Sequence, residues 1–195
     1  MLDFISNKST CLLMSKNSIE EDYRELYVYG FNIIYSTLFI ILSITAISYF
    51  IFNDICYSFI YIIVFIPLRA FAGGYHSSSY LGCFSISNIF FIIATFFTFF
   101  LNNLPVLMQY MLLLIFSLYI CWSQQSKKNI ETVYTLEDHK KFQRNVTILC
   151  IFWCFVFGIL LHFTKYSSMI VSTILIVAIM IHIKNRKEKN HDSSF

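Results

Sequence analysis

The sequence predicts an all-α, polytopic membrane protein with six transmembrane helices and an N-terminal amphipathic helix. Hydrophobic residues make up 57% of the 195 residues and charged residues only 13%, which is too apolar for an ordinary soluble domain. The charges are also confined to a few segments, and the apolar runs between them are long enough for helices that cross a bilayer. Together these observations exclude a soluble globular fold.

Five of the expected spans are plain, since each is a run of residues without charge. They are 31–52, 84–101, 104–122, 146–163 and 167–183. The sixth, 55–68, would reach only about 21 Å as a helix at ~1.5 Å per residue. A hydrocarbon core is roughly 30 Å thick. We therefore expect this segment either to continue through Ala72 and cross, or to form a tilted or half-membrane element.

The basic residues predict the orientation of the chain. With six spans, all but Lys165 of the 14 Lys and Arg residues fall on one side of the membrane. The positive-inside rule makes that side the cytoplasm of a multi-pass protein of the cell membrane, with both termini there. These charges are suited to the head groups of anionic lipids. They form no patch on a soluble basic fold, so nucleic acid is not an expected partner.

The chain divides into three parts. Residues 1–29 mix apolar and charged side chains, and we expect an amphipathic segment at the inner membrane surface, with a frayed tail as the alternative. Residues 30–183 form the six-span membrane domain, in which the cytoplasmic loop 123–145 is the one sizeable soluble segment. Residues 184–195 form a charged cytoplasmic tail, which we expect to be disordered.

The segment from Arg69 to Cys83 places polar and reactive side chains at the inner end of the spans. Such groups are costly near hydrocarbon, so their grouping there indicates a function. His76 is a candidate general base, and Cys83 is a candidate nucleophile. Arg69 is suited to stabilising an oxyanion or binding a carboxylate, with an anchor at the membrane interface as the alternative. Gly73 and Gly74 permit a turn that admits a peptide, or they only end the preceding helix.

Helix geometry limits how His76 and Cys83 can meet. On one straight helix their Cα atoms would lie about 10.5 Å apart at ~1.5 Å per residue, out of reach of a hydrogen bond. The chain must therefore turn between them, and a run of serines favours such a break. We expect the next helix to start near Ser78 or Ser79. Cys83 then lies in its first turn, where the helix dipole favours a thiolate.

Other residues are weaker candidates. Ser85 and Asn88 are near enough to orient His76, and the sequence selects neither. Cys150 and Cys154 lie at i, i+4 on one span, but no neighbouring histidine or carboxylate completes a metal site, so we interpret them as packing residues. The sequence therefore predicts no metal and no other cofactor.

The pattern of Arg69, Gly73, Gly74, His76 and Cys83 resembles the accessory gene regulator B (AgrB) family, membrane cysteine endopeptidases of Gram-positive quorum sensing. The resemblance implies that His76 is the catalytic histidine and Cys83 the nucleophile, with Arg69 and the two glycines in supporting positions. It also implies a short AgrD-type propeptide as the substrate, and a homodimer as a state of assembly.

The chemistry implied by this resemblance is cleavage of the propeptide through an acyl-enzyme thioester on Cys83, followed by closure of a ring within the same peptide. A membrane peptide transporter and a non-catalytic scaffold are the alternatives. A transporter is disfavoured because Asp54, Arg69 and Lys165 lie at the edges of the spans, whereas transport paths place ionisable residues inside them.

Overall fold

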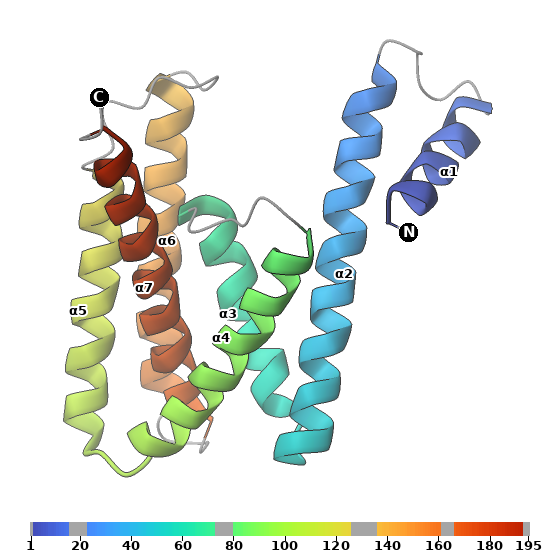
Figure 1. Cartoon of the computed structure of the whole chain (residues 1–195). Helices are drawn as coiled ribbons and strands as arrows, with labels where there is room; N and C mark the ends of the chain where they lie inside the picture. The colour runs from blue at the N-terminus through green and yellow to red at the C-terminus, as the bar shows by residue number, and fades with distance from the viewer. Residues whose placement is uncertain (1, 16–22, 73–79, 126–135, 161–165, 193–195) are drawn as a thin grey trace.

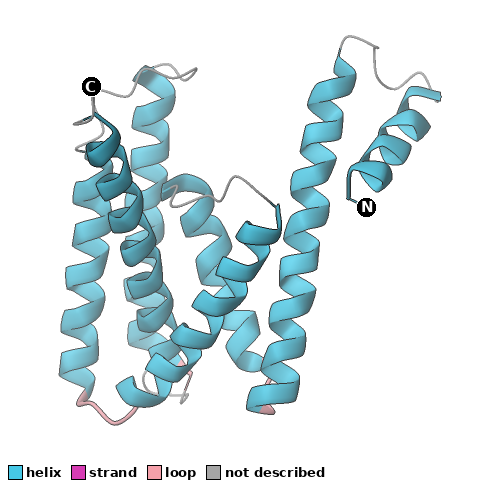
Figure 2. Cartoon of the chain, viewed as in Figure 1, coloured by secondary structure: helices cyan, strands magenta, loops and turns pink. Residues whose placement is uncertain are grey.

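The computed structural model is an all-helical bundle over the residues that the structure describes (Figure 1). Among these residues, short loops at 53–55 and 102–105 join consecutive helices (Figure 2). The structure describes residues 2–15, 23–72, 80–125, 136–160 and 166–192, and no strand occurs within these ranges. The helices in chain order are α1 (Leu2–Ser15), α2 (Arg24–Phe52), α3 (Cys56–Ala72), α4 (Tyr80–Leu101), α5 (Val106–Gln125), α6 (Leu136–Leu160) and α7 (Ser167–Asp192).

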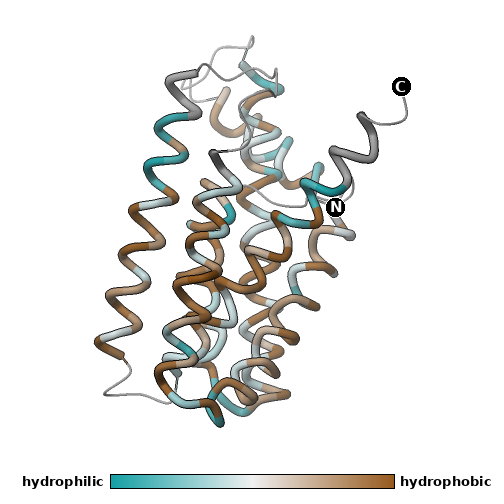
Figure 3. Tube along the Cα trace, turned by 90° about the vertical axis from the view of Figure 1, so that its left-hand side faces the viewer, coloured by the Kyte–Doolittle hydropathy of each residue, from teal (hydrophilic) through white to brown (hydrophobic). Residues whose placement is uncertain are grey.

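The helices confirm the predicted class of an all-α, polytopic membrane protein. Among the described residues, five helices are long and apolar enough to cross a membrane, namely α2, α4, α5, α6 and α7. The sixth apolar helix, α3, is shorter and continues through Ala72 for 17 residues, about 25 Å at ~1.5 Å per residue. Figure 3 shows hydrophobic residues along most of each long helix and hydrophilic residues gathered near the end where α6 begins.

The turn between α2 and α3 forms where the sequence places Asn53 and Asp54. Asn53 ends α2 in the left-handed conformation with a φ of 52°, which asparagine tolerates better than most residues. The Asp54 carboxylate then accepts a hydrogen bond from the backbone N–H of Cys56 at 3.0 Å, at the start of α3. Polar residues thus decide where the two apolar helices separate.

Helix α7 is the centre of the bundle. In the most apolar 18-residue stretch of α7, 72% of the residues are buried inside the structure. The corresponding share for α2, at the edge of the bundle, is 11% (Figure 1). Helices α3, α4 and α5 pack around α7. Small hydroxyl residues line these contacts: Thr98 and Ser172 share a hydrogen bond of 2.7 Å, and Ser168 donates to Gln109 at 2.8 Å. Such residues let membrane helices approach closely and satisfy their polar groups against one another.

Helix α1 packs along α2 with its polar side inward. The Ser6 hydroxyl donates to Asn32 Oδ1 at 2.7 Å, and Asn32 Nδ2 donates to Asp3 Oδ1 at 2.9 Å. On the outside, Phe4 and Leu12 are 74% and 58% exposed. The predicted N-terminal amphipathic helix is therefore present, with an apolar side left free for lipid.

The prediction of a disordered tail is wrong over residues 184–192, because α7 continues to Asp192. Lysine, arginine and glutamate are good helix formers, and a helix already formed in the membrane domain propagates without a new nucleus. Both ends of the predicted loop 123–145 are helical as well, since α5 reaches Gln125 and α6 begins at Leu136. Residues 126–135 lie outside the described residues.

Candidate functional site

Two of the five predicted site residues lie within the described structure, and the fold brings them together. Arg69 is in the last turn of α3, and Cys83 is in the first turn of α4. His76, Gly73 and Gly74 lie outside the described residues, as does the predicted break among the serines before Tyr80. The pairing of His76 with Cys83 therefore stays a prediction, whereas the position of Cys83 in a first helical turn is as expected.

The facing ends of α3 and α4 are set back from the end of the bundle. In Figure 1 they lie lower than the neighbouring ends of α2 and α6. At ~1.5 Å per residue α3 is about 25 Å long, whereas α2, with 29 residues, is about 43 Å long and exceeds a hydrocarbon core of ~30 Å. The short α3 thus ends, and α4 begins, at a level of the bundle where the longer helices α2 and α6 continue further.

The Arg69 guanidinium contacts the Cys83 sulfur directly. Arg69 Nη2 donates to Cys83 Sγ at 3.3 Å, and Arg69 Nη1 donates to Ser87 Oγ at 3.1 Å. The guanidinium carbon also lies 5.5 Å from the centre of the Phe65 ring, in a cation–π contact. Because a guanidinium is always charged, this arrangement sets a permanent positive charge against the Cys83 sulfur.

An antiparallel register between α3 and α4 produces these contacts. One turn back from Arg69 along α3 is Phe65, and one turn further is Tyr61, which stacks on Phe65 at a centroid distance of 4.8 Å. Two turns forward from Cys83 along α4 is Phe91, which meets Tyr61 edge-on at 5.2 Å. Aromatic packing in the membrane interior therefore fixes the register that sets the cation against the sulfur.

Cys83 is less buried than the residues packed around the Arg69 guanidinium. Ser87 and Leu68 are fully buried, at 0% exposure, whereas Cys83 is only partly buried. Arg69 is also only partly buried, so the guanidinium and the cysteine lie at the edge of the packed interior, beside fully buried neighbours.

A sequence model of a protein family, described as accessory gene regulator B, matches residues 6–181. This match covers most of the chain, including both described site residues and the helices that carry them. The chain belongs to the AgrB family. Family membership and the helical membrane fold agree on a membrane protein of quorum sensing. No curated protein and no solved structure matches the chain.

The sequence did not identify Ser87 as part of the site of this AgrB family member. Of the two residues suggested to orient His76, Ser85 is exposed. The other, Asn88, is engaged elsewhere, because its amide donates to the Phe84 carbonyl at 2.8 Å and accepts from the Ser43 hydroxyl at 2.8 Å. The spacing of Ser87, one helical turn after Cys83, is the signal that would have selected it.

The described residues of this AgrB family member hold no group of three metal-binding side chains. All six cysteines are free thiols. Cys150 is buried at 3% exposure, and Cys154 Sγ lies 3.8 Å from Ser117 Oγ on α5. These thiols contribute to the packing of α6 against α5, in line with the interpretation from the sequence.

Proposed function

We propose that this AgrB family member is a membrane cysteine endopeptidase that cleaves a short AgrD-type signalling propeptide, with Cys83 as the nucleophile and His76 as the general base. The observation that carries the proposal is the hydrogen bond of 3.3 Å from the Arg69 guanidinium to Cys83 Sγ. A cation held against a partly buried sulfur at the start of a helix is the environment of a reactive cysteine. Packing alone does not require an arginine there.

In the proposed first step, His76 takes the proton of the Cys83 thiol, and the thiolate attacks the carbonyl carbon of the scissile peptide bond. The carbonyl π electrons move onto oxygen. Arg69 lies against the sulfur and is therefore near the developing oxyanion, which its N–H groups stabilise. When the oxyanion collapses, the C–N bond breaks and His76 donates its proton to the leaving amine. The peptide is then held as a thioester on Cys83.

In the second step, a thiol or hydroxyl within the same peptide attacks the thioester carbonyl. A new thioester or ester bond closes a ring, the bond to Cys83 Sγ breaks, and the sulfur recovers its proton from the attacking group by way of His76. Limited access of water at the membrane edge favours ring closure over hydrolysis. The role we propose for Gly73 and Gly74 is to permit a turn at which the peptide backbone can approach closely.

We propose that the site lies at the cytoplasmic face of the cell membrane, with both termini and the segments 123–145 and 184–195 on that side. The distribution of basic residues supports this orientation. The same residues are suited to anionic lipid head groups. A homodimer, implied by the resemblance to the family, belongs to the proposal as well.

The test is co-expression of the full chain with the short propeptide encoded beside its gene, followed by mass spectrometry of the peptide products. Cys83→Ala and His76→Ala are each expected to abolish processing at unchanged levels in the membrane. Cys11→Ala is the matched control, because Cys11 is an exposed thiol on α1, and it should process the propeptide normally. Normal processing by Cys83→Ala would overturn the proposal and leave transport or a scaffold as the function.

A further inference from the structure

Ser87 carries a buried hydroxyl whose hydrogen-bond partner is a charged side chain. Its residue is 0% exposed, and its Oγ accepts a hydrogen bond from Arg69 Nη1 at 3.1 Å. A hydroxyl moved from water into an apolar environment is costly unless it is hydrogen-bonded, so this contact explains how a serine is tolerated here.

Other buried hydroxyls of α4 are satisfied differently. Thr95 donates to the Phe91 carbonyl and Thr98 to the Ala94 carbonyl, each at 2.9 Å and each one turn back along their own helix. This is the usual way for a membrane helix to satisfy such a group. Thr98 also shares a hydrogen bond with the neutral hydroxyl of Ser172 on α7. Ser87 differs in that its partner is a charged side chain, that of Arg69, which indicates a role toward that side chain.

The shape of the guanidinium makes this contact significant for Cys83. The group is planar and presents its N–H donors in a rigid fork. One arm of the fork reaches Ser87 and the other reaches Cys83, which lie one turn apart on the same face of α4. Phe65 contacts the guanidinium as well, but a ring face does not fix rotation within the guanidinium plane. The hydroxyl supplies the second fixed point.

We propose that Ser87 is a positioning residue for Cys83, which acts by holding the Arg69 guanidinium against the sulfur. The inference rests on the proposed function in that it takes Cys83 to be the nucleophile. It goes further because Ser87 lies outside the segment 69–83 that carries the motif, and it is here assigned to the same site. Ser87 does not touch the reacting atoms, so its effect is on the population of thiolate and on the orientation of the cation.

The test measures the rate at which iodoacetamide alkylates Cys83 in the full chain in membranes, by mass spectrometry of the peptide that contains Cys83, as a function of pH. In Ser87→Ala the rate at neutral pH should fall about fivefold, the size expected for the loss of one hydrogen bond. The pH of half-maximal rate should rise toward the ~8.5 of a free thiol. Arg69→Ala should show at least as large a change.

Matched variants separate the hydroxyl from the packing. Thr95→Val removes a buried hydroxyl of the same helix that donates to the Phe91 carbonyl, and it should leave the profile unchanged. Ser87→Thr and Ser87→Val have nearly the same shape and differ by the hydroxyl, so Thr should keep the wild-type profile and Val should not. If Ser87→Ala fails to reach the membrane, the comparison of the Thr and Val variants still tests the role of the hydroxyl.

A wild-type alkylation profile in Ser87→Ala, or equal profiles for the Thr and Val variants, would overturn the inference. Loss of propeptide processing without a change in the profile would also overturn it, because that result fits a purely structural role. The proposed function fails by a different result, namely processing that survives Cys83→Ala, so the two failures are distinguishable.

Discussion

Arg69 Nη2 and Cys83 Sγ lie 3.3 Å apart, although the two residues are separated by 14 positions in the chain and belong to different helices. The contact depends on the packing below it. Tyr61 and Phe65 stack on α3, and Tyr61 meets Phe91 on α4. Tyr61, Phe65 and Arg69 follow one another at one-turn intervals along α3, and Phe91 lies two turns after Cys83 along α4. The contact between Tyr61 and Phe91 therefore sets the register in which the guanidinium reaches the sulfur. A membrane-embedded aromatic cluster thus determines the geometry of a polar site.

Arg69→Ala should lower the rate of propeptide processing by about 10²-fold or more, as found when one donor to an oxyanion is removed. Arg69→Lys should rescue little, because an ammonium lacks the fork that contacts both Cys83 and Ser87. Mass spectrometry of the peptide products measures both rates. Arg24→Ala, at the start of α2, is the control and should process normally. Normal processing by Arg69→Ala would show that the cation has no part in the reaction.

Tyr61→Phe should stabilise the protein or leave its stability unchanged. The Tyr61 side chain is 0% exposed, and its hydroxyl has no hydrogen-bond partner within the described part of the chain. Removal of an unsatisfied buried hydroxyl gains on the order of 1 kcal/mol. The ring, which keeps the register of α3 and α4, is retained. Thermal unfolding in detergent measures the change.

Tyr35→Phe is the matched control for that variant. The Tyr35 hydroxyl shares a hydrogen bond of 2.7 Å with Ser9, so its removal should lower the midpoint of unfolding. A midpoint for Tyr61→Phe that falls as far as that of Tyr35→Phe would mean that the Tyr61 hydroxyl has a partner after all.

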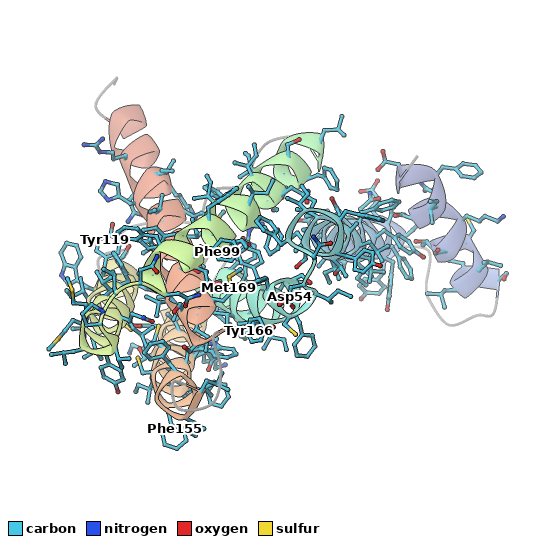
Figure 4. All side chains as sticks on the ribbon, turned by 90° about the horizontal axis from the view of Figure 1, so that it is seen from below. Asp54, Phe99, Tyr119, Phe155, Tyr166 and Met169 are labelled. Atoms are coloured by element: carbon cyan, nitrogen blue, oxygen red, sulfur yellow. The ribbon has the colours of Figure 1, made fainter. Side chains whose placement is uncertain are left out.

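Tyr166→Phe should lower the midpoint of thermal unfolding. The Tyr166 hydroxyl donates to Asp54 Oδ2 at 2.6 Å and so ties the start of α7 to the turn between α2 and α3 (Figure 4). Tyr27→Phe, which alters an exposed tyrosine of α2, should have little effect. Equal midpoints for the wild type and Tyr166→Phe would contradict a role for this contact in stability.

The same contact has a definite pH dependence. The hydrogen bond to Asp54, with desolvation and the nearby negative charge, raises the pKa of Tyr166 above its ordinary value. A raised folded-state pKa means that the stabilisation is fully present below the unfolded value of ~10 and is lost as the pH rises through the folded value. The difference in unfolding midpoint between the wild type and Tyr166→Phe should therefore be constant between about pH 7 and 9 and should decrease above about pH 10, where the tyrosine of the unfolded chain ionises first. A difference that stays constant above about pH 10 would argue against the raised pKa.

Asn32→Leu should release α1 from α2. The Asn32 amide joins Ser6 and Asp3 and is 5% exposed, so a leucine there breaks two contacts at once and leaves the Ser6 hydroxyl buried without that partner. Hydrogen exchange of the amides of residues 2–15 should become faster, while that of α7 stays unchanged. Ser36→Ala removes a hydroxyl that donates to the Ile33 carbonyl of its own helix and is the control. Unchanged exchange in α1 would mean that its apolar residues hold it in place.

The fold could be predicted from the sequence to a large extent, because the bilayer imposes a simple length requirement. A run such as 31–52 has no charge and exceeds that length, so α2 follows directly. The breaks at Asn53 and after Leu101 were equally plain, since polar turn residues interrupt apolar runs there. The helical tail of α7 was missed because charge composition argued for disorder, whereas an existing helix extends at little cost.

By itself the sequence determined the helices, the family resemblance and the identity of Arg69 and Cys83 as candidates. Only the tertiary structure decided that Arg69 contacts Cys83, that Ser87 shares the guanidinium, and that Asn88 is bound elsewhere. Hydropathy and motif spacing can be read from a single segment of the chain. A sufficiently long apolar segment is enough to predict a transmembrane helix. Which side chains meet between two helices depends on their register and rotation, and these are set by aromatic and small-residue packing that no single segment contains.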